Sequence, residues 1–577
     1  MLGVKFLIFV GFVMFYFSAI FADTNLGLMD IERALQIQDD LMVQDQNRLR
    51  YDQSIRDQLF EKKQFQDQSA SDLSVQISEI SPNIEADLPS FMITDIQFDG
   101  VKSLNRYHIR RLKASYLNRE LSLNHINQLV NQLTNLYIRK GYITTRAYIP
   151  TQNLNLGVLT LMVQEGMIED VRFYGLSSVQ SWNLFPRLKG KVLNIRSIEQ
   201  GLDQLNRLQS NSARIQLLPS KVKLGNSIVV IQNQVRLRGS SSIRYDTLSQ
   251  SRLAILPNSL DLSYDNLLGL NDQWLLNYSQ KFKDQEQYNN SYSLRLSFPF
   301  RYSMLVSSYS QFDYLIIING LTRQFNATGK TKVVALSLDH IIFRNTIGKI
   351  KLSTGLTTKE TVSFIEDMRS DIGSHKLVIL NVSSDYTLYL PWLGSLKSGI
   401  TYYRGISRFN ATLNNPLALA IEPKPQFKKI SAHVNWRKRI KWLGVPIQFQ
   451  SAWQCQYSNF TLYSSERIGI GGGSTVRGYR TLLQGDYGIQ TSTTITYPLF
   501  KHLSFFHALD GGTIYQKGGR DRNGVWGEGS MIGISTGLQF EYRLFSTTVT
   551  LSKGIRASHY VEKPSYVLYF SLIKRFI

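Results

Sequence analysis

The C-terminal half of the chain alternates between apolar and polar residues, and this pattern constrains the fold more than any other feature. In one example, serine or arginine separates most members of an apolar series: Tyr292, Leu294, Leu296, Phe298 and Phe300. We find no convincing long amphipathic helix between residues 237 and 577, so strands are predicted throughout this half. A membrane β-barrel and a soluble β-sandwich both produce such alternation. The same period of two recurs at 333–338, 349–355, 378–386, 489–497, 533–542 and 566–576.

The first 22 residues carry the signature of a secretory signal peptide. Lys5 precedes an apolar run over 6–17, and small residues lead to a predicted cleavage after Ala22. A transmembrane anchor is the alternative, but the run is short for one. No later stretch contains 18 consecutive apolar residues. The mature chain is therefore expected to be exported, and any membrane crossing must use strands.

Composition favours the barrel over the sandwich and excludes several classes of function. Tyrosine and phenylalanine number 30 each, a surplus typical of the aromatic girdles of membrane barrels. The formal net charge is +22, but the basic residues are scattered and no nucleic-acid-binding motif is present, so contact with lipid or lipopolysaccharide is expected and nucleic acid is not. A single cysteine, Cys455, excludes an internal disulfide and a multi-cysteine metal site.

Residues that could carry catalysis or hold a cofactor do not form a recognisable constellation. The eight histidines show no metal-binding spacing, and there is no Ser/His/Asp set or nucleophile elbow. The adjacent carboxylates Asp39 and Asp40 are interpreted as surface charges of a solvated helix. We therefore expect neither an enzyme nor a cofactor or metal.

Residues 23–68 contain no proline and one glycine, Gly27, and are rich in glutamine, aspartate and basic side chains. A thin apolar stripe predicts one long helix whose polar surface suits a water-filled lumen; a solvated or coiled-coil helix is the alternative. Residues 69–90 lose this periodicity and contain Pro82 and Pro89. They are predicted to be a linker that spans several tens of ångströms when extended.

Two α/β modules are predicted next, at 91–166 and 167–236. In the first we expect a single strand over 92–98, then two helices and two further strands. The second module repeats the order strand, helix, helix, strand, strand. A three-stranded sheet has exposed edges to which an extended client segment could add as a further strand, although the modules could also be spacers.

The strand-rich region, 237–577, is long enough for a large barrel. Roughly 340 residues at about 21 residues per strand and turn give about 16 antiparallel strands. Turns at 391–394 and 498–501 are predicted to be periplasmic, whereas 357–375 and 413–427 are predicted to be extracellular loops.

Residues 466–488 interrupt the strand pattern with a glycine-rich, charged segment. Its glycines allow positive φ angles and close packing, so we expect a long loop folded inside the barrel. A flexible surface loop is the alternative. A phosphate-binding loop is not supported, because no Gly-Lys-Ser/Thr follows and no strand–loop–helix unit surrounds the segment.

Within this loop, the motif Val476-Arg477-Gly478-Tyr479 resembles that of two-partner secretion transporters of the haemolysin-activator (ShlB/FhaC/HecB) type. The two modules resemble POTRA domains, with 133–138, 146–150 and 199–208 as the most similar stretches. The resemblance implies a 16-stranded outer-membrane barrel with two periplasmic POTRA domains and an N-terminal plug helix. It also implies secretion of one large β-helical exoprotein without ATP, the POTRA domains binding its N-terminal secretion domain.

The resemblance further implies that Asp510 on the inner wall pairs with Arg477. Three positions depart from the family pattern. Ala508 stands where the family has a phenylalanine, and Ile577 replaces the usual terminal aromatic residue. Ser90 and Glu120 occupy the places of a cysteine pair found in many relatives, so the first module is expected to rely on packing alone.

Two other functions stay open at this point. A BamA-type assembly factor shares the POTRA domains and the loop motif, but usually has more POTRA domains and no plug helix. A passive solute channel with a periplasmic extension is the second alternative. A monomeric barrel is expected, and the client could be a haemolysin, an adhesin or a contact-dependent toxin.

Overall fold

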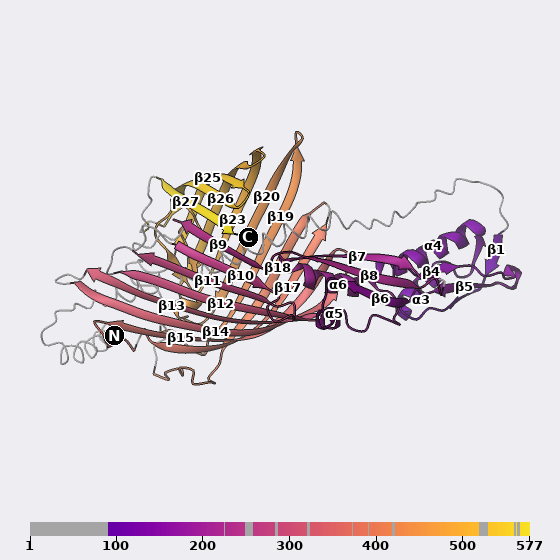
Figure 1. The fold of residues 1–577 in the computed structure, drawn as a ribbon, viewed down its shortest axis with the longest axis horizontal. Helices are drawn as coiled ribbons and strands as arrows, with labels where there is room; N and C mark the ends of the chain where they lie inside the picture. Colours follow the sequence, from indigo (N-terminus) through magenta and orange to yellow (C-terminus); the bar gives the residue numbers. More distant parts are fainter. Residues whose placement is uncertain are drawn as a thin grey trace.

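The computed structural model describes residues 90–223, 225–247, 258–282, 287–319, 324–371, 373–390, 392–417, 422–517, 529–558, 561 and 566–576. The predicted signal peptide, plug helix and linker therefore lie outside the described residues, apart from Ser90, which begins the first strand. Figure 1 shows two small modules extending from one end of a large barrel. Among the described residues, no helix has the length and apolar content needed to cross a membrane.

The first module is built on two helices and two small sheets. Its core contains fully buried side chains of α4, spaced three or four residues apart: Ile126, Leu129, Leu133 and Tyr137. The three-stranded sheet has the order β2–β5–β4. The elements are β1 (Ser90–Ile93), β2 (Asp95–Asp99), α3 (Arg106–Ala114), β3 (Arg119–Ser122), α4 (Leu123–Arg139), β4 (Arg146–Tyr148), η1 (Leu154–Leu156) and β5 (Val158–Gln164).

The single strand predicted over 92–98 is wrong. The chain is divided at Thr94, whose backbone N–H donates to the Gly157 carbonyl at 2.8 Å. β1 then pairs antiparallel with β3, a short strand between the two helices that was not predicted, while β2 pairs parallel with β5. In the β1–β3 ladder Ser90 lies opposite Ser122, and Met92 lies opposite Glu120. Backbone hydrogen bonds therefore join the two strands in which many relatives carry the cysteine pair.

Glu165, at the end of the first module, joins a loop to helix α4. Its carboxylate accepts from the backbone N–H groups of Lys102 and Ser103 at 2.9 and 2.7 Å, and from the Tyr137 hydroxyl at 2.9 Å. Burial alone would raise the pKa of Glu165, but a hydrogen bond from the Ser103 hydroxyl, at 2.7 Å, together with these three outweighs it and leaves the pKa below its ordinary value. Glu165 therefore has a structural role in this module.

The second module repeats the plan with a sheet of order β6–β8–β7. Its helices cover one face and bury Ile198 and Leu205 against Val229 and Ile231 of the central strand. The elements are β6 (Ile168–Tyr174), α5 (Ser178–Leu184), α6 (Ile195–Asn206), β7 (Asn211–Pro219) and β8 (Ser227–Val235). The predicted order of elements is confirmed for this module.

The barrel closes when its last strand pairs antiparallel with its first, as Ser571 lies opposite Asp246. Sixteen long antiparallel strands and the two-residue β16 make up the described wall. The long strands are β9 (Gly239–Asp246), β10 (Asn258–Asp265), β11 (Gln273–Phe282), β12 (Tyr288–Phe300), β13 (Ser303–Asn319), β14 (Gln324–Arg344), β15 (Gly348–Ile365), β17 (His375–Leu390), β18 (Gly394–Gly405), β19 (Lys428–Trp442), β20 (Val445–Ser458), β23 (Tyr487–Phe500), β24 (Leu503–Tyr515), β25 (Gly529–Tyr542), β26 (Phe545–Ala557) and β27 (Val567–Phe576).

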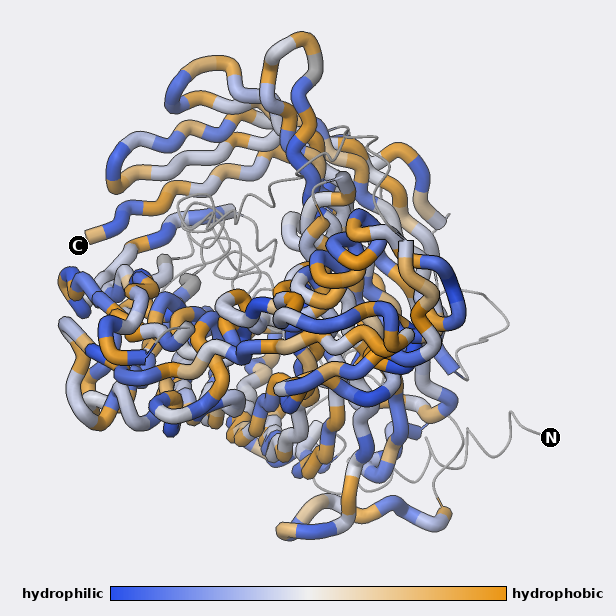
Figure 2. Tube along the Cα trace, turned by 90° about the vertical axis from the view of Figure 1, so that its right-hand side faces the viewer, coloured by the Kyte–Doolittle hydropathy of each residue, from blue (hydrophilic) through white to orange (hydrophobic). Residues whose placement is uncertain are grey.

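Apolar side chains of the barrel face outward and polar ones face inward. On β14, Val334, Leu336 and Leu338 are about half exposed, whereas Asn277 and Ser279 of β11 are buried. Figure 2 shows the resulting alternation of hydrophobic and hydrophilic residues along the strands. This arrangement is the reverse of a soluble sandwich, and it confirms the membrane barrel.

The predicted extracellular loop at 357–375 is mostly strand. β15 continues to Ile365, and the short β16 (Met368–Arg369) pairs back onto it before β17 begins at His375. Ladder pairing with β14 satisfies the backbone groups of this extension, so the wall continues where a loop was expected. The segment 413–427 lies, as predicted, in a connection between strands β18 and β19.

Candidate functional site: the loop inside the barrel

Residues 466–488 connect β20 to β23 and pack against the inner wall. Within the loop, β21 (Ile468–Ile470) pairs antiparallel with β22 (Leu483–Gly485). This hairpin and the tip residues form an apolar cluster with side chains of β24 and β25. The buried members of the cluster are Ile468, Ile470, Val476, Tyr479, Leu483, Ile514, Met531 and Val561. The loop therefore has a small apolar core of its own against the inner wall.

Arg477 lies at the loop tip beside Asp510 of β24. Its Nε donates to one carboxylate oxygen at 2.6 Å, and its terminal nitrogen donates to the other at 2.7 Å. The Ser492 hydroxyl of β23 also donates to Asp510, at 2.7 Å. The Asp510 side chain is 0% exposed, and two-pronged contact of this kind is the strongest that arginine makes with a carboxylate.

Glycines allow the loop tip to approach the wall. Gly478 has φ +96°, and a Cβ there would lie 2.5 Å from the Lys553 carbonyl carbon. Two further glycines belong to the wall itself. A Cβ on Gly533 would lie 1.9 Å from the Arg477 carbonyl oxygen, and one on Gly554 would lie 2.6 Å from the Tyr479 ring. These two positions were not predicted, although a glycine inside a strand often indicates a close approach of this kind.

Tyr479 fills the space that Gly554 leaves. Its hydroxyl lies 2.8 Å from the carbonyl oxygen of Ile532 and 2.7 Å from that of Arg556, on the neighbouring strands β25 and β26. The side chain is fully buried. The four motif residues thus act together: Val476 and Tyr479 pack, Gly478 makes room and Arg477 binds the wall carboxylate.

The base of the loop has a second charged anchor. Glu466 binds Lys359 of β15 and lies 2.6 Å from the Lys429 ammonium of β19. Asp486 is also fully buried and accepts from the backbone N–H groups of Leu462 and Lys517, each at 2.8 Å. The sequence indicated Glu466 and Asp486 as charges of the loop. It gave no signal for the two lysines, because their strands are distant in the chain and only barrel closure brings them near.

The alanine at 508, one of the departures from the family motif, lies beside Asp510 on the inner face of β24. Phe506, Ala508 and Asp510 share one face of β24, and all three are buried. Phe506 lies opposite Gly537, where a Cβ would meet its ring at 2.5 Å. The aromatic side chain on this face thus stands four residues before Asp510, and small Ala508 lies between them.

Comparison with known proteins assigns the chain to a family. The family described as haemolysin secretion/activation protein ShlB/FhaC/HecB matches residues 225–540, more than half of the chain. The chain belongs to this family of outer-membrane transporters. A ShlB-type POTRA domain matches residues 91–166, and a second POTRA domain matches 167–219.

Individual relatives agree with this assignment. The chain is 30% identical to outer membrane transporter CdiB of Escherichia coli, over 78% of this chain and 76% of the relative. It is 27% identical to hemolysin transporter protein ShlB of Serratia marcescens, over 89% of this chain and 90% of the relative. The solved structure of CdiB from Escherichia coli superposes with a TM-score of 0.82 at 25% identity, covering 92% of this chain and 99% of that one. The predicted outer-membrane transporter of two-partner secretion, with periplasmic POTRA domains, is therefore confirmed over the alternative of an assembly factor.

POTRA 2 is docked on the periplasmic mouth of the transporter barrel. Asp203 of α6 lies 2.7 Å from Arg344 at the end of β14 and 3.5 Å from Lys349 of β15. Arg207 donates to the Ser297 hydroxyl of β12 at 2.7 Å and to the Asn271 carbonyl at 2.6 Å. Burial alone would raise the pKa of Asp203, but the charges of Lys349 and Arg344 outweigh it and hold that pKa below its ordinary value.

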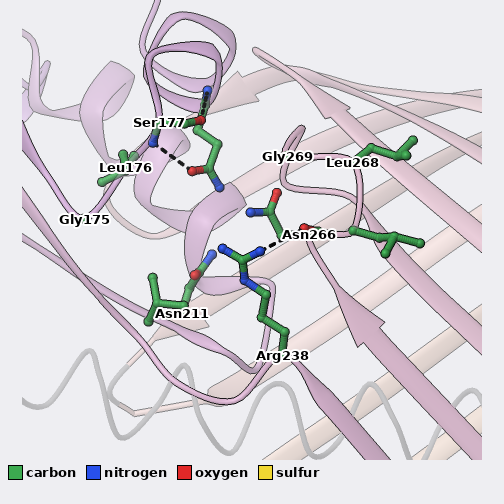
Figure 3. A pocket seen from close by; sticks show the side chains of 11 residues that line it. Gly175, Leu176, Ser177, Asn211, Arg238, Asn266, Leu268 and Gly269 are labelled. Carbon is green, nitrogen blue, oxygen red and sulfur yellow. Dashed lines mark hydrogen bonds between the residues drawn. The ribbon is translucent and has the colours of Figure 1, made fainter.

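A recess of about 540 Å³ lies between POTRA 2 and the turn that joins β10 to β11 (Figure 3). Gly175 to Ser177 and Gln180 line one side, and Asn266 to Gly269 line the other, with Arg238 between them. The Arg238 guanidinium donates to the Asn266 carbonyl at 3.4 Å. The described residues contain no group of three or more His, Cys, Asp or Glu side chains that could hold a metal ion.

Proposed function

We propose that this transporter secretes one large exoprotein through its barrel without ATP, after the POTRA domains bind the client's N-terminal secretion domain in the periplasm. The docking of POTRA 2 at the barrel mouth carries the proposal. Asp203, Arg207 and their partners hold the second module directly against the turns of β11 to β15. A client segment bound to POTRA 2 therefore lies at the periplasmic entrance of the barrel lumen.

The edge strands of the modules supply the chemistry of client binding. In POTRA 1 the order β2–β5–β4 leaves β2 and β4 at the edges, and in POTRA 2 the order β6–β8–β7 leaves β6 and β7 there. Exposed Tyr148 of β4 lies opposite exposed Met162 of β5. Backbone pairing with an edge, together with such side chains, suits an extended segment of a β-rich client.

The proposal includes a resting plug formed by residues 23–68, whose polar composition suits a hydrated lumen. It also includes a monomeric barrel in contact with outer-membrane phospholipid and lipopolysaccharide. No catalytic step, cofactor or nucleic acid takes part. Arg477 and Asp510 have a structural role in transport, because they hold the loop 466–488 against the inner wall while the client passes through the barrel.

Deletion of 91–166 tests the function. In the part of the chain that the structure describes, the barrel strands pair with one another and not with strands of 91–166, so the variant is expected to insert while secretion of the client exoprotein is lost. Secretion is measured in the culture medium, and barrel folding is measured by heat-dependent gel mobility. Secretion at the parent level would show that POTRA 1 is a spacer.

Deletion of 23–68 tests the plug in planar bilayers. The expected result is a higher single-channel conductance, because the lumen of the variant no longer contains the polar helix. An unchanged conductance would contradict the plug. High and steady conductance in the intact protein would instead support the passive channel.

A further inference from the structure

Helix α5 of POTRA 2 presents an apolar face that its own module does not cover. Gln180, Asn183 and Leu184 are buried, whereas Val179 and Trp182, three residues apart on one face, are exposed. The Trp182 residue is 61% exposed. A large aromatic side chain left open on a soluble module indicates contact with another apolar phase or surface.

This face lies at the lipid-facing rim of the barrel. The Trp182 ring centroid is 6.1 Å from that of Phe300, the last residue of β12. Phe300 is 46% exposed and belongs to the outward-facing series of that strand, with Tyr292. Since outward aromatic residues at strand ends form the interfacial girdle of a membrane barrel, Trp182 lies at the level of the girdle.

Hydrogen bonds hold α5 in this place. The Asn183 side chain donates to the Pro299 carbonyl at 2.7 Å and to the Leu270 carbonyl at 3.4 Å. The Arg301 backbone N–H donates to the Asn183 carbonyl at 3.2 Å. A buried carboxamide therefore joins α5 to two periplasmic turns, so the position of Trp182 is fixed by the fold.

Arg301 places a cation over the two aromatic rings. Its guanidinium carbon lies 5.9 Å from the Trp182 centroid and 5.1 Å from the Phe300 centroid. Its φ of +55° is uncommon for a residue other than glycine. An arginine over interfacial aromatic side chains presents its charge at the height of lipid phosphates.

The neighbouring turn adds exposed leucines. Leu267 and Leu268 are both more than half exposed, in a turn that the buried Asp272 carboxylate holds by accepting from their backbone N–H groups at 3.1 Å. In Figure 3 the Leu268 side chain points away from Arg238 and the recess. The carbonyl of Leu270 in this turn accepts from Asn183 of α5, so the two leucines lie at the same end of the barrel as Trp182 and add to its exposed apolar side chains.

We infer that Val179, Trp182, Leu267, Leu268, Phe300 and Arg301, here called the rim patch, bind the headgroup region of the periplasmic phospholipid leaflet. The apolar members enter the boundary with the acyl chains, and Arg301 binds an anionic headgroup. The continuity of the patch with the lipid-facing girdle favours phospholipid over a protein. The inference deepens the proposed function: contact with the leaflet adds to the hydrogen bonds and ion pairs that hold POTRA 2 on the barrel, and so supports the direction of its client-binding edges.

The test uses full-length protein in vesicles of phosphatidylethanolamine and phosphatidylglycerol that contain a nitroxide-headgroup lipid. With Cys455→Ser, a polarity-sensitive fluorophore is attached through Ser178→Cys, which lies one turn before Trp182. The matched control is Ser115→Cys, an exposed serine of POTRA 1. The nitroxide is expected to quench the label at 178 and to leave the label at 115 near the value without nitroxide.

Two substitutions assign the quenching to the patch. Trp182→Ser with Arg301→Ser is expected to lower quenching at 178, because the lipid contact is lost while the hydrogen bonds of Asn183 keep α5 at the rim. Arg301→Gln alone is expected to weaken it with phosphatidylglycerol but not when phosphatidylcholine replaces that lipid. Heat-dependent gel mobility verifies that each barrel is folded.

Three outcomes would overturn the inference: equal quenching at 178 and 115, no effect of the double substitution, or shielding of 178 only when exoprotein is added. The last would make the patch a client site. Secretion is measured separately, so a protein that secretes but shows no quenching contradicts the rim patch alone. Failure of the proposed function would instead appear as unchanged secretion after deletion of 91–166.

Discussion

The POTRA domains bury mainly apolar side chains, whereas the barrel also buries many polar and charged ones. In POTRA 1 the interior is apolar, and Leu129 and Leu133 of α4 are fully buried. In the barrel the side chains that are fully buried around the loop include carboxylates such as Asp510, while Leu336 is 50% exposed on the outer face. The same hydrophobic effect explains both, because the surroundings of the modules are water and those of the wall are lipid.

The two regions are stabilised by different kinds of interaction. A module in water is held by apolar contacts, and removing one leaves a cavity. The loop inside the barrel is held by paired charges as well as by its apolar cluster, and removing one charged partner leaves the other buried without compensation.

The largest effect is expected at Arg477 and Asp510. Arg477→Ala or Asp510→Ala leaves one buried charge unpaired, which costs about 3–5 kcal/mol. Each variant is expected to lose secretion while surface insertion persists, and hydrogen exchange of 466–488 should increase. The double variant should be little worse than either single one, because both remove the same contact. Arg477→Lys should rescue only partly, since lysine lacks the two-pronged geometry.

Full secretion by Arg477→Ala, or strictly additive losses in the double variant, would remove the pair from the mechanism. The buried charge pair would then contribute no more to the stability of the loop than an exposed surface pair does.

The core of POTRA 1 should respond to a loss of apolar volume. Leu133→Ala is expected to destabilise the module by about 2–5 kcal/mol, because the α4 core cannot refill the space. Leu336→Ala on the outer face of β14 is the matched control, since acyl chains fill the vacated volume. Hydrogen exchange in the full-length protein should show faster opening of α4 for the first variant and parent-like exchange of β14 for the second. If both variants opened equally fast, burial in the POTRA 1 core and exposure on the outer face of the barrel would not make the two leucines differ in their contribution to stability.

The contact between the two regions should weaken in acid. The pKa of Asp203 is lowered in the folded protein, so its contribution is present above the ordinary carboxyl pKa of about 4 and is lost as the pH falls through the lower value. Asp203→Asn should therefore loosen the docking of POTRA 2 already at neutral pH, by on the order of 1–3 kcal/mol. Site-specific cross-linking of the module to the barrel measures the docking as a function of pH.

Glu199 also contacts Arg344, at 3.6 Å, so a residual pH dependence is expected in that variant. Asp170→Asn is the control, because Asp170 pairs with Lys189 within POTRA 2. If it loosens the docking as much as Asp203→Asn does, the pH effect does not arise at the interface.

Several features of this protein follow from the sequence alone, because they depend on residues close together in the chain. Alternation with a period of two predicts the strands and their two faces, and helical spacing predicts α4 and α6. The motif Val476 to Tyr479 indicates the loop by its local composition. The break at Thr94 and the continuation of β15 to Ile365 were missed because each depends on a partner strand that local periodicity does not reveal.

Only the tertiary structure decided which distant residues meet. Closure of the wall brings Lys359 and Lys429 to Glu466, and it places Gly533 and Gly554 behind the loop tip. Folding at the barrel mouth likewise sets Trp182 beside Phe300, although 117 positions separate them in the numbering. A sequence pattern reports the face of an element on which a residue lies. The pairing of two faces is fixed by backbone hydrogen bonds around a closed sheet, and these are long-range contacts that the pattern of either strand does not contain.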